Sequence, residues 1–164
     1  LLACVTNRIE NVKYWLSRFP DWNLEEPNKF VGGIALGCAV LMGPNRFDLT
    51  KLLLESGALC SALSHTGSSI LMSACGNEDA DPSVVELIMH YDKNVNYRRR
   101  SRTSKWFAIR FVAKMLVRCR LTSSMLFQRL ATEIGDTALH QATRRGDMEI
   151  VELLLGVRKV LQCG

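Results

Sequence analysis

The segment from Gly135 to Leu155, GDTALHQATRRGDMEIVELLL, describes a short helix, a tight turn and a second helix. Asp136 and Thr137 are good helix-start residues, and Gly146 separates the two helices. The second helix carries a wide apolar stripe, made of Ile150, Val151, Leu153, Leu154 and Leu155. A hairpin of about twenty residues has too little core to bury this stripe alone. The unit must therefore stack against copies of itself.

Two further copies of this pattern lie upstream. Residues 67–89 place SSILMSAC in the first helix and VVELIM in the second, and residues 33–54 repeat the arrangement. Equivalent positions are taken by Leu36, Leu71 and Leu139, which are 35 and 68 residues apart. Such regular self-similarity predicts an array of stacked helical hairpins.

These units resemble the ankyrin repeat, which has a Thr-Pro-Leu-His-like first helix and a Val-Val-x-Leu-Leu-like second helix. Thr137, Leu139 and His140 match the first signature, with Ala138 where the family prefers Pro. The resemblance implies an all-α ankyrin-repeat solenoid of stacked helix-turn-helix units with short projecting β-hairpin loops, called fingers below. It also implies a structural role for His140, as a hydrogen-bond partner of backbone and hydroxyl groups across the turn between repeats.

We expect residues 1–164 to form a single array. Its parts are a partial repeat at 1–24, repeats at 31–62 and 65–96, a degenerate repeat or helical insertion at 97–134, and a repeat at 135–164. In the first interpretation, Trp106–Arg120 and Ser123–Thr132 are the helices of a decayed repeat, which the near-integral spacing favours; in the second, they bulge from the stack. Because the chain opens inside a repeat without an initiator Met, we expect a piece of a longer protein.

Composition indicates in which cellular environment this array is expected. The longest uncharged apolar run, Val31 to Gly43, is too short to cross a bilayer. The six Cys residues lack paired spacing, and Cys4 and Cys75 fall at the same small, buried repeat position. We expect reduced thiols packed between helices rather than a disulfide or metal site, and hence an intracellular protein, cytoplasmic or nuclear.

Charge is distributed unevenly. Between Lys93 and Thr132 there are eleven Lys or Arg residues and no acidic residue, whereas the rest of the chain has ten basic and sixteen acidic residues. The four-residue spacing of Arg110, Lys114 and Arg118 predicts one basic helical face. Opposite that face we expect an apolar one, made of Phe107, Phe111 and Met115. The basic stripe has three interpretations: a solvated face, a site for an acidic protein segment, or a surface for nucleic acid or anionic lipid. No nucleic-acid recognition motif accompanies it.

No catalytic, metal or cofactor motif is visible. His65, His90 and His140 lie at three different repeat positions, and the acidic loop at residues 78–81 does not spell a calcium cage. Gly32 and Gly33 lack the Lys and Ser or Thr of a phosphate loop. We therefore expect no enzyme and no cofactor.

What remains is a binding scaffold without chemistry of its own. In a stacked array the fingers and the concave helical face are free for recognition, and the fingers are expected at Asn23–Lys29, Ala58–Thr66 and Asn94–Arg102. The candidate partner-binding residues are Arg98, Arg99, Arg100, Arg102, Arg144, Arg145, His65 and Gln141. The expected partner is a protein with an acidic segment, bound by a monomeric fragment. The alternatives are nucleic acid or anionic lipid on residues 98–129, or a regulatory arm of a larger protein.

Overall fold

The structure, a computed structural model, describes residues 1–29 and 32–162, without the side chains of the last six. This part of the chain contains ten helices and no strand: α1 (Leu2–Val5), α2 (Ile9–Arg18), α3 (Ala35–Leu41), α4 (Phe47–Glu55), α5 (Ile70–Cys75), α6 (Pro82–Tyr91), α7 (Ser104–Arg118), α8 (Met125–Thr132), α9 (Ala138–Arg145) and α10 (Met148–Gln162). None of these helices is long and apolar enough to cross a membrane.

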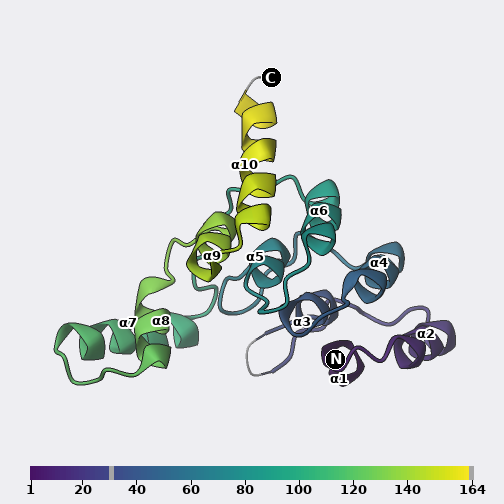
Figure 1. Ribbon diagram of the computed structural model, residues 1–164. Coiled ribbons are helices and arrows are strands. Elements are labelled where there is room, and N and C mark those ends of the chain that lie inside the picture. Colours follow the sequence, from purple (N-terminus) through teal and green to yellow (C-terminus); the bar gives the residue numbers. More distant parts are fainter. Residues whose placement is uncertain (30–31, 163–164) are drawn as a thin grey trace.

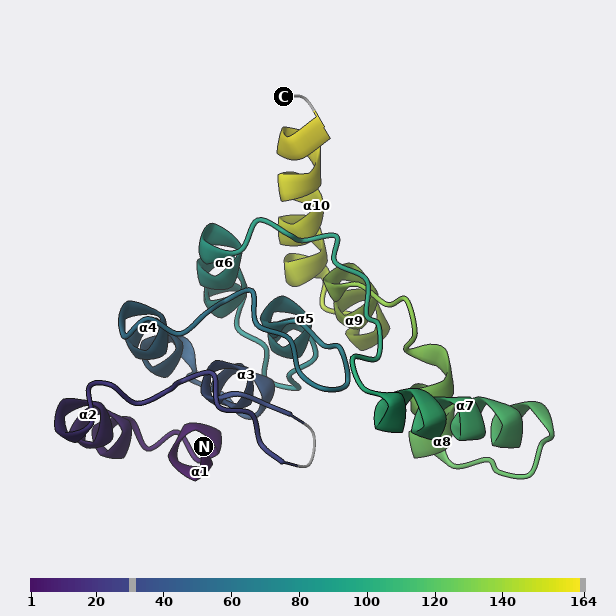
Figure 2. The same cartoon turned by 180° about the vertical axis from the view of Figure 1, so that it is seen from behind.

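Eight of the helices form two parallel rows (Figure 1). The inner row is α1, α3, α5 and α9, and the outer row is α2, α4, α6 and α10; each helix contacts the next in its row and its own hairpin partner. Figure 2 shows the same two rows from behind. The predicted stacking of helical hairpins is therefore present, and all-α is the fold class.

The core follows the repeat positions that the sequence defines. Leu36 and Leu71 are buried in the inner row, whereas Leu53, Val85 and Ile150 are buried in the outer row. Burying each such side chain contributes about 1.5–3 kcal/mol. Because every apolar stripe packs on two neighbouring hairpins, the stability of each hairpin depends on the next one.

Every finger closes with the same pair of backbone hydrogen bonds around a glycine. In the finger before α5, the Gly67 N–H donates to the Ser64 carbonyl at 2.9 Å, and the Ser64 N–H donates to the Ser68 carbonyl at 3.0 Å. Gly67 has a φ of +80°, so this is a β-bulge with glycine in the left-handed position. Gly32 and Gly135 occupy the same place in the other two fingers.

The fingers are the short projecting hairpin loops that we expected, with very little strand pairing. Over the described residues, the only bridge-type pairing is the isolated one between Leu63 and Ser69. Its brevity follows from the bulge, which ends strand pairing after one residue pair.

Residues 97–134 leave the array instead of stacking within it. Helices α7 and α8 pack on each other, whereas α9 lies directly against α5, and α10 against α6. A repeat in register would place its helices between those pairs. These contacts favour the insertion over the decayed repeat, and we propose that residues 97–134 are an insertion.

The insertion starts at the tip of a finger. Arg99 and Asp136 hold its neck, because the Arg99 N–H donates to the Asp136 carbonyl at 2.8 Å and the Gly135 N–H donates to the Arg99 carbonyl at 3.0 Å. The equivalent bonds of the preceding finger are separated only by His65 and Thr66. A two-residue tip is thus replaced by residues 100–134, which form the helical hairpin α7–α8 that projects from the array in Figures 1 and 2.

On α7, Lys114 and Arg118 are exposed as expected for a basic face, but Arg110 departs from the sequence-based expectation. Arg110, expected on a basic solvent face, is only 1% exposed, whereas Phe107 is 66% and Phe111 56% exposed. The physical reason is that α7 packs mainly on α8, through the side of the helix that carries Ile109 and Ala113, which are less exposed. Arg110 lies at the edge of that side and is buried with it.

Candidate partner-binding surface

A hollow of about 300 Å³ lies where the insertion meets the inner helices. Its walls come from α3, α5 and α9, from the finger around Gly67, and from α8. We call it the inner groove, and its polar lining consists of Ser64, Thr66, Ser68, Ser73, Arg99, Arg129, Glu133 and Gln141. The hydroxyl groups of the serines and Thr66 offer both hydrogen-bond donors and acceptors.

Arg99 forms one side of the inner groove. Its side chain is buried and makes an ion pair with Glu133, while its Nε has no hydrogen-bond partner among the described residues. Arg98 and Arg100 are exposed, because successive side chains of an extended segment point to opposite sides. Of these three consecutive arginines, only Arg99 faces the groove, and the other two face the solvent.

Three other predicted residues are held by contacts within the molecule. The buried Asp136 carboxylate accepts hydrogen bonds from Gln141 Nε2 at 3.1 Å and from Arg144 Nη2 at 2.8 Å. Arg145 Nη2 donates to the backbone carbonyl of Glu78. Arg144 thus pairs with the Asp136 carboxylate, and Arg145 ties α9 to the backbone before α6. Both side chains are therefore engaged within the molecule.

His65 and Arg102 lie in a different hollow, of about 460 Å³, which Glu25 also lines. The His65 ring covers Gly32, where a Cβ atom would lie 2.1 Å from the ring Cγ. The Arg102 Nη1 donates to the Leu63 carbonyl at 3.4 Å. The eight predicted residues therefore do not form one continuous basic surface.

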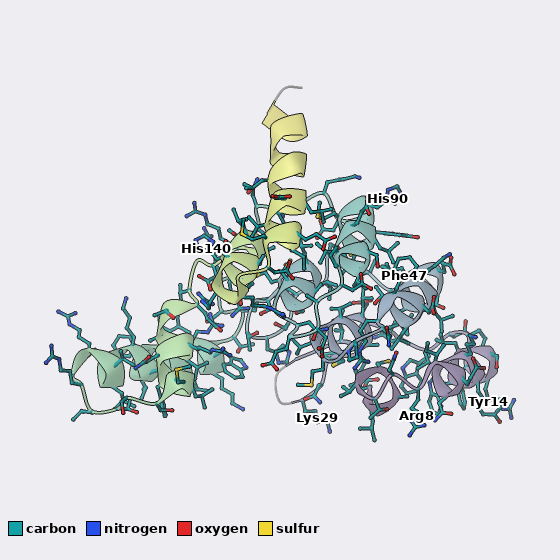
Figure 3. All side chains as sticks on the ribbon, viewed as in Figure 1. Arg8, Tyr14, Lys29, Phe47, His90 and His140 are labelled. Atoms are coloured by element: carbon teal, nitrogen blue, oxygen red, sulfur yellow. The ribbon has the colours of Figure 1, made fainter. Side chains whose placement is uncertain are left out.

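His140 contacts the start of its own helix. The Thr137 N–H donates to His140 Nδ1 at 3.2 Å, and the Thr137 hydroxyl lies 2.9 Å from the same nitrogen. This closes a capping box at the start of α9. Figure 3 labels His140 on that helix.

The thiols and the acidic groups give no metal centre in the described part of the chain, where no three His, Cys, Asp or Glu residues cluster. Cys60 and Cys75 are buried free thiols, and burial raises the pKa of each to about 12. They are held as neutral, packed groups. Cys119, in contrast, is exposed.

Sequence reasoning missed part of the inner groove. Arg129 and Glu133 come from α8 and its C-terminal end, and Ser64 and Ser68 from the finger. The finger hydroxyls could have been found from the position of Gly67 in the repeat. The α8 residues could not, because nothing in the repeat pattern indicates where an insertion folds back.

The stacked hairpins define the class of this molecule as a helical repeat protein. The family model of the ankyrin repeat matches residues 134–162, and the all-α array of stacked hairpins is consistent with an ankyrin-repeat solenoid. No curated protein sequence matches the chain. Ankyrin repeats are in general protein-interaction modules and are typically non-catalytic.

Proposed function

We propose that this chain is a non-catalytic scaffold that binds an acidic, extended segment of a partner protein in the inner groove. The observation that carries the proposal is the groove itself, which combines the repeat face with a wall that the insertion supplies. A segment lying there would contact the inner row of helices and a finger together, which are the parts of a repeat array left free for recognition.

The charges around the groove set the chemistry of the partner. Arg129 lines the groove, is exposed and makes no ion pair within the described residues. Arg98 and Arg100, the chain neighbours of Arg99, are exposed and likewise form no ion pair among those residues. A carboxylate of the partner can pair with Arg129, since planar guanidinium and carboxylate groups match each other. Serine hydroxyls can then bind the backbone of the segment.

The setting proposed for this binding is a reducing compartment, the cytoplasm or the nucleus. The thiols of Cys4, Cys38, Cys60, Cys75 and Cys119 are all free. Thiols persist in that state where glutathione and thioredoxin keep them reduced. A monomeric chain leaves the inner groove open to the partner.

A test uses the full chain and three synthetic peptide pools of equal length: Glu- and Asp-rich, uncharged, and Lys-rich. The acidic pool should bind most tightly in isothermal titration calorimetry. Ser73→Tyr places a bulky side chain in the groove and should weaken binding at least tenfold. Glu86→Tyr places the same bulky side chain on the exposed side of α6, away from the groove, and should leave the affinity nearly unchanged.

Arg129→Glu gives the electrostatic half of the test. It should reduce affinity for the acidic pool and increase affinity for the Lys-rich pool, because the groove charge reverses. The proposal fails if Ser73→Tyr and Glu86→Tyr bind alike, or if the three pools bind equally. Circular dichroism of each variant controls for the fold.

A further inference from the structure

The α7–α8 hairpin exposes seven large apolar side chains to solvent. Each is between 45% and 72% exposed, and together we call them the arm face: Phe107, Phe111, Val112, Met115, Leu121, Met125 and Leu126. This many exposed large apolar side chains on one hairpin mark a contact with a protein or a membrane, unlike the single exposed apolar residues of an ordinary surface.

The arm face has a definite geometry. Phe107, Phe111 and Met115 follow one another at four-residue steps and share one side of α7. Leu121 lies in the turn between α7 and α8, and Met125 begins α8. Figures 1 and 2 show this hairpin projecting away from both rows of helices, with the α7–α8 turn at its far end. The apolar side chains are thus carried to a position that the array itself cannot cover.

Basic groups surround this apolar face. Lys114, Arg118 and Arg120 are exposed on the same hairpin, and none of them forms an ion pair within the described residues. No Asp or Glu occurs from residue 93 to residue 132. The arm therefore presents apolar side chains flanked by positive charge alone.

We propose that the arm face docks on an anionic lipid surface. An interfacial helix places Phe and Leu at the acyl boundary while Lys and Arg remain among the headgroups. The lack of any acidic residue over the whole arm matches a surface of uniformly negative sign. A projecting end reaches a planar bilayer without a complementary groove in a partner. Docking by the arm leaves the repeat array exposed to other molecules, so this inference is independent of partner binding in the inner groove.

The test is co-flotation of the full chain with vesicles. Phosphatidylcholine vesicles that also contain phosphatidylserine should carry the protein, whereas vesicles of phosphatidylcholine alone should not. Added salt should reduce binding, since headgroup attraction falls off within a Debye length. The double variant Lys114→Glu with Arg118→Glu should bind at least tenfold more weakly, because each basic residue near the surface contributes about a fivefold change.

The apolar half of the proposal has its own variant. Phe107→Ser with Phe111→Ser should lower vesicle binding at least tenfold. Tyr14→Ser is the matched control, because Tyr14 is 71% exposed on α2, at the opposite end of the array (Figure 3). Phe107→Trp adds a direct readout that does not depend on loss of binding: its fluorescence should be quenched by brominated lipid beyond the quenching of the wild-type chain.

Three results would overturn the inference. One is equal flotation with both kinds of vesicle, which would remove the role of charge. The second is flotation of the serine double variant at the wild-type level. The third is an arm face that binds an acidic protein segment while the chain floats with neither vesicle, which would assign the face to a protein partner.

Discussion

Gly67 lies directly against the backbone carbonyl of Arg100. A Cβ atom on residue 67 would be 1.8 Å from that oxygen, and a Cβ atom on Gly32 would be 2.1 Å from the ring of His65. Neighbouring fingers therefore touch at the glycine positions of their bulges. Packing between fingers adds a second line of contact to the stacking of the helices.

This contact predicts a large difference between two glycine substitutions. Gly67→Ala should destabilise the chain by about 2–4 kcal/mol, because it combines a strained positive φ with a backbone collision. Gly57 also has a positive φ, of +91°, but nothing lies within 4 Å of the position of its Cβ. Gly57→Ala should cost only about 1 kcal/mol. Urea unfolding of both variants measures the difference, and equal losses would contradict the finger contact.

Arg110 offers a prediction of opposite sign. Its guanidinium is buried at the base of the insertion, and its Nε and Nη1 have no hydrogen-bond partner among the described residues. Burial lowers its pKa, and the nearby Arg99 charge lowers it further. Arg110→Met keeps most of the volume and removes the unpaired charge, so we expect a gain in stability of about 1–4 kcal/mol.

Thermal and urea unfolding of Arg110→Met measure this gain. Arg118→Met is the control, because Arg118 is exposed on the same helix and should change stability by less than about 0.5 kcal/mol. A clear loss of stability in Arg110→Met would show that the buried cation is paired and stabilising.

The repeat core was predictable because its signal is periodic. Leu36, Leu71 and Leu139 mark equivalent buried or half-buried sites, and the helices start where their neighbouring Gly and Thr or Ser residues indicate. These features depend on local propensity and on stacking between neighbours, both of which a single sequence displays.

The insertion was not predictable from spacing. Gly32 and Gly67 are 35 residues apart, and Gly67 and Gly135 are 68 apart. The excess is about one repeat length of roughly 33 residues, so an inserted hairpin and a decayed repeat give the same register. Only the contact between α5 and α9 separates them.

The residues of the candidate site were also hard to predict, because their exposure and pairing depend on the folded structure. Alternation along an extended segment buries Arg99 beside two exposed arginines, and ion pairing ties Arg144 to Asp136. Both effects depend on partners that are remote in sequence or on a local geometry that charge counting ignores. The excess of basic residues indicated which segment carries positive charge. It did not indicate which arginine side chains remain without an ion pair inside the molecule.

The two buried thiols predict a stability change in alkaline solution. An unfolded Cys ionises near its ordinary pKa of 9.0, whereas Cys60 and Cys75 hold their protons up to about pH 12 in the folded chain. Above pH 9 the unfolded state therefore binds fewer protons than the folded state. Stability should be fully present below pH 9 and should fall through the window up to about pH 12, by as much as about 1.4 kcal/mol per pH unit for each thiol.

Urea unfolding at several pH values across this window measures that slope. Cys60→Ala with Cys75→Ala should reduce the slope, whatever its effect on stability at neutral pH. Cys119→Ala is the control, since Cys119 is exposed. An unchanged slope in the double variant would mean that these thiols ionise in the folded chain as they do in the unfolded one.

The insertion itself can be removed by design. The neck around Arg99 and Gly135 has the same bulge as the finger from Ser64 to Gly67, whose tip is His65 and Thr66. Replacing residues 100–134 by a His-Thr dipeptide should therefore restore an ordinary finger and leave the array folded. The stacking of α5 on α9 and of α6 on α10 does not pass through the insertion.

The shortened chain should lose the helical signal of α7 and α8 in circular dichroism and keep a cooperative unfolding transition. We expect a loss of only about 1–3 kcal/mol, because the ion pair between Arg99 and Glu133 is removed. A shortened chain that is unfolded would contradict the insertion and return residues 97–134 to the stack.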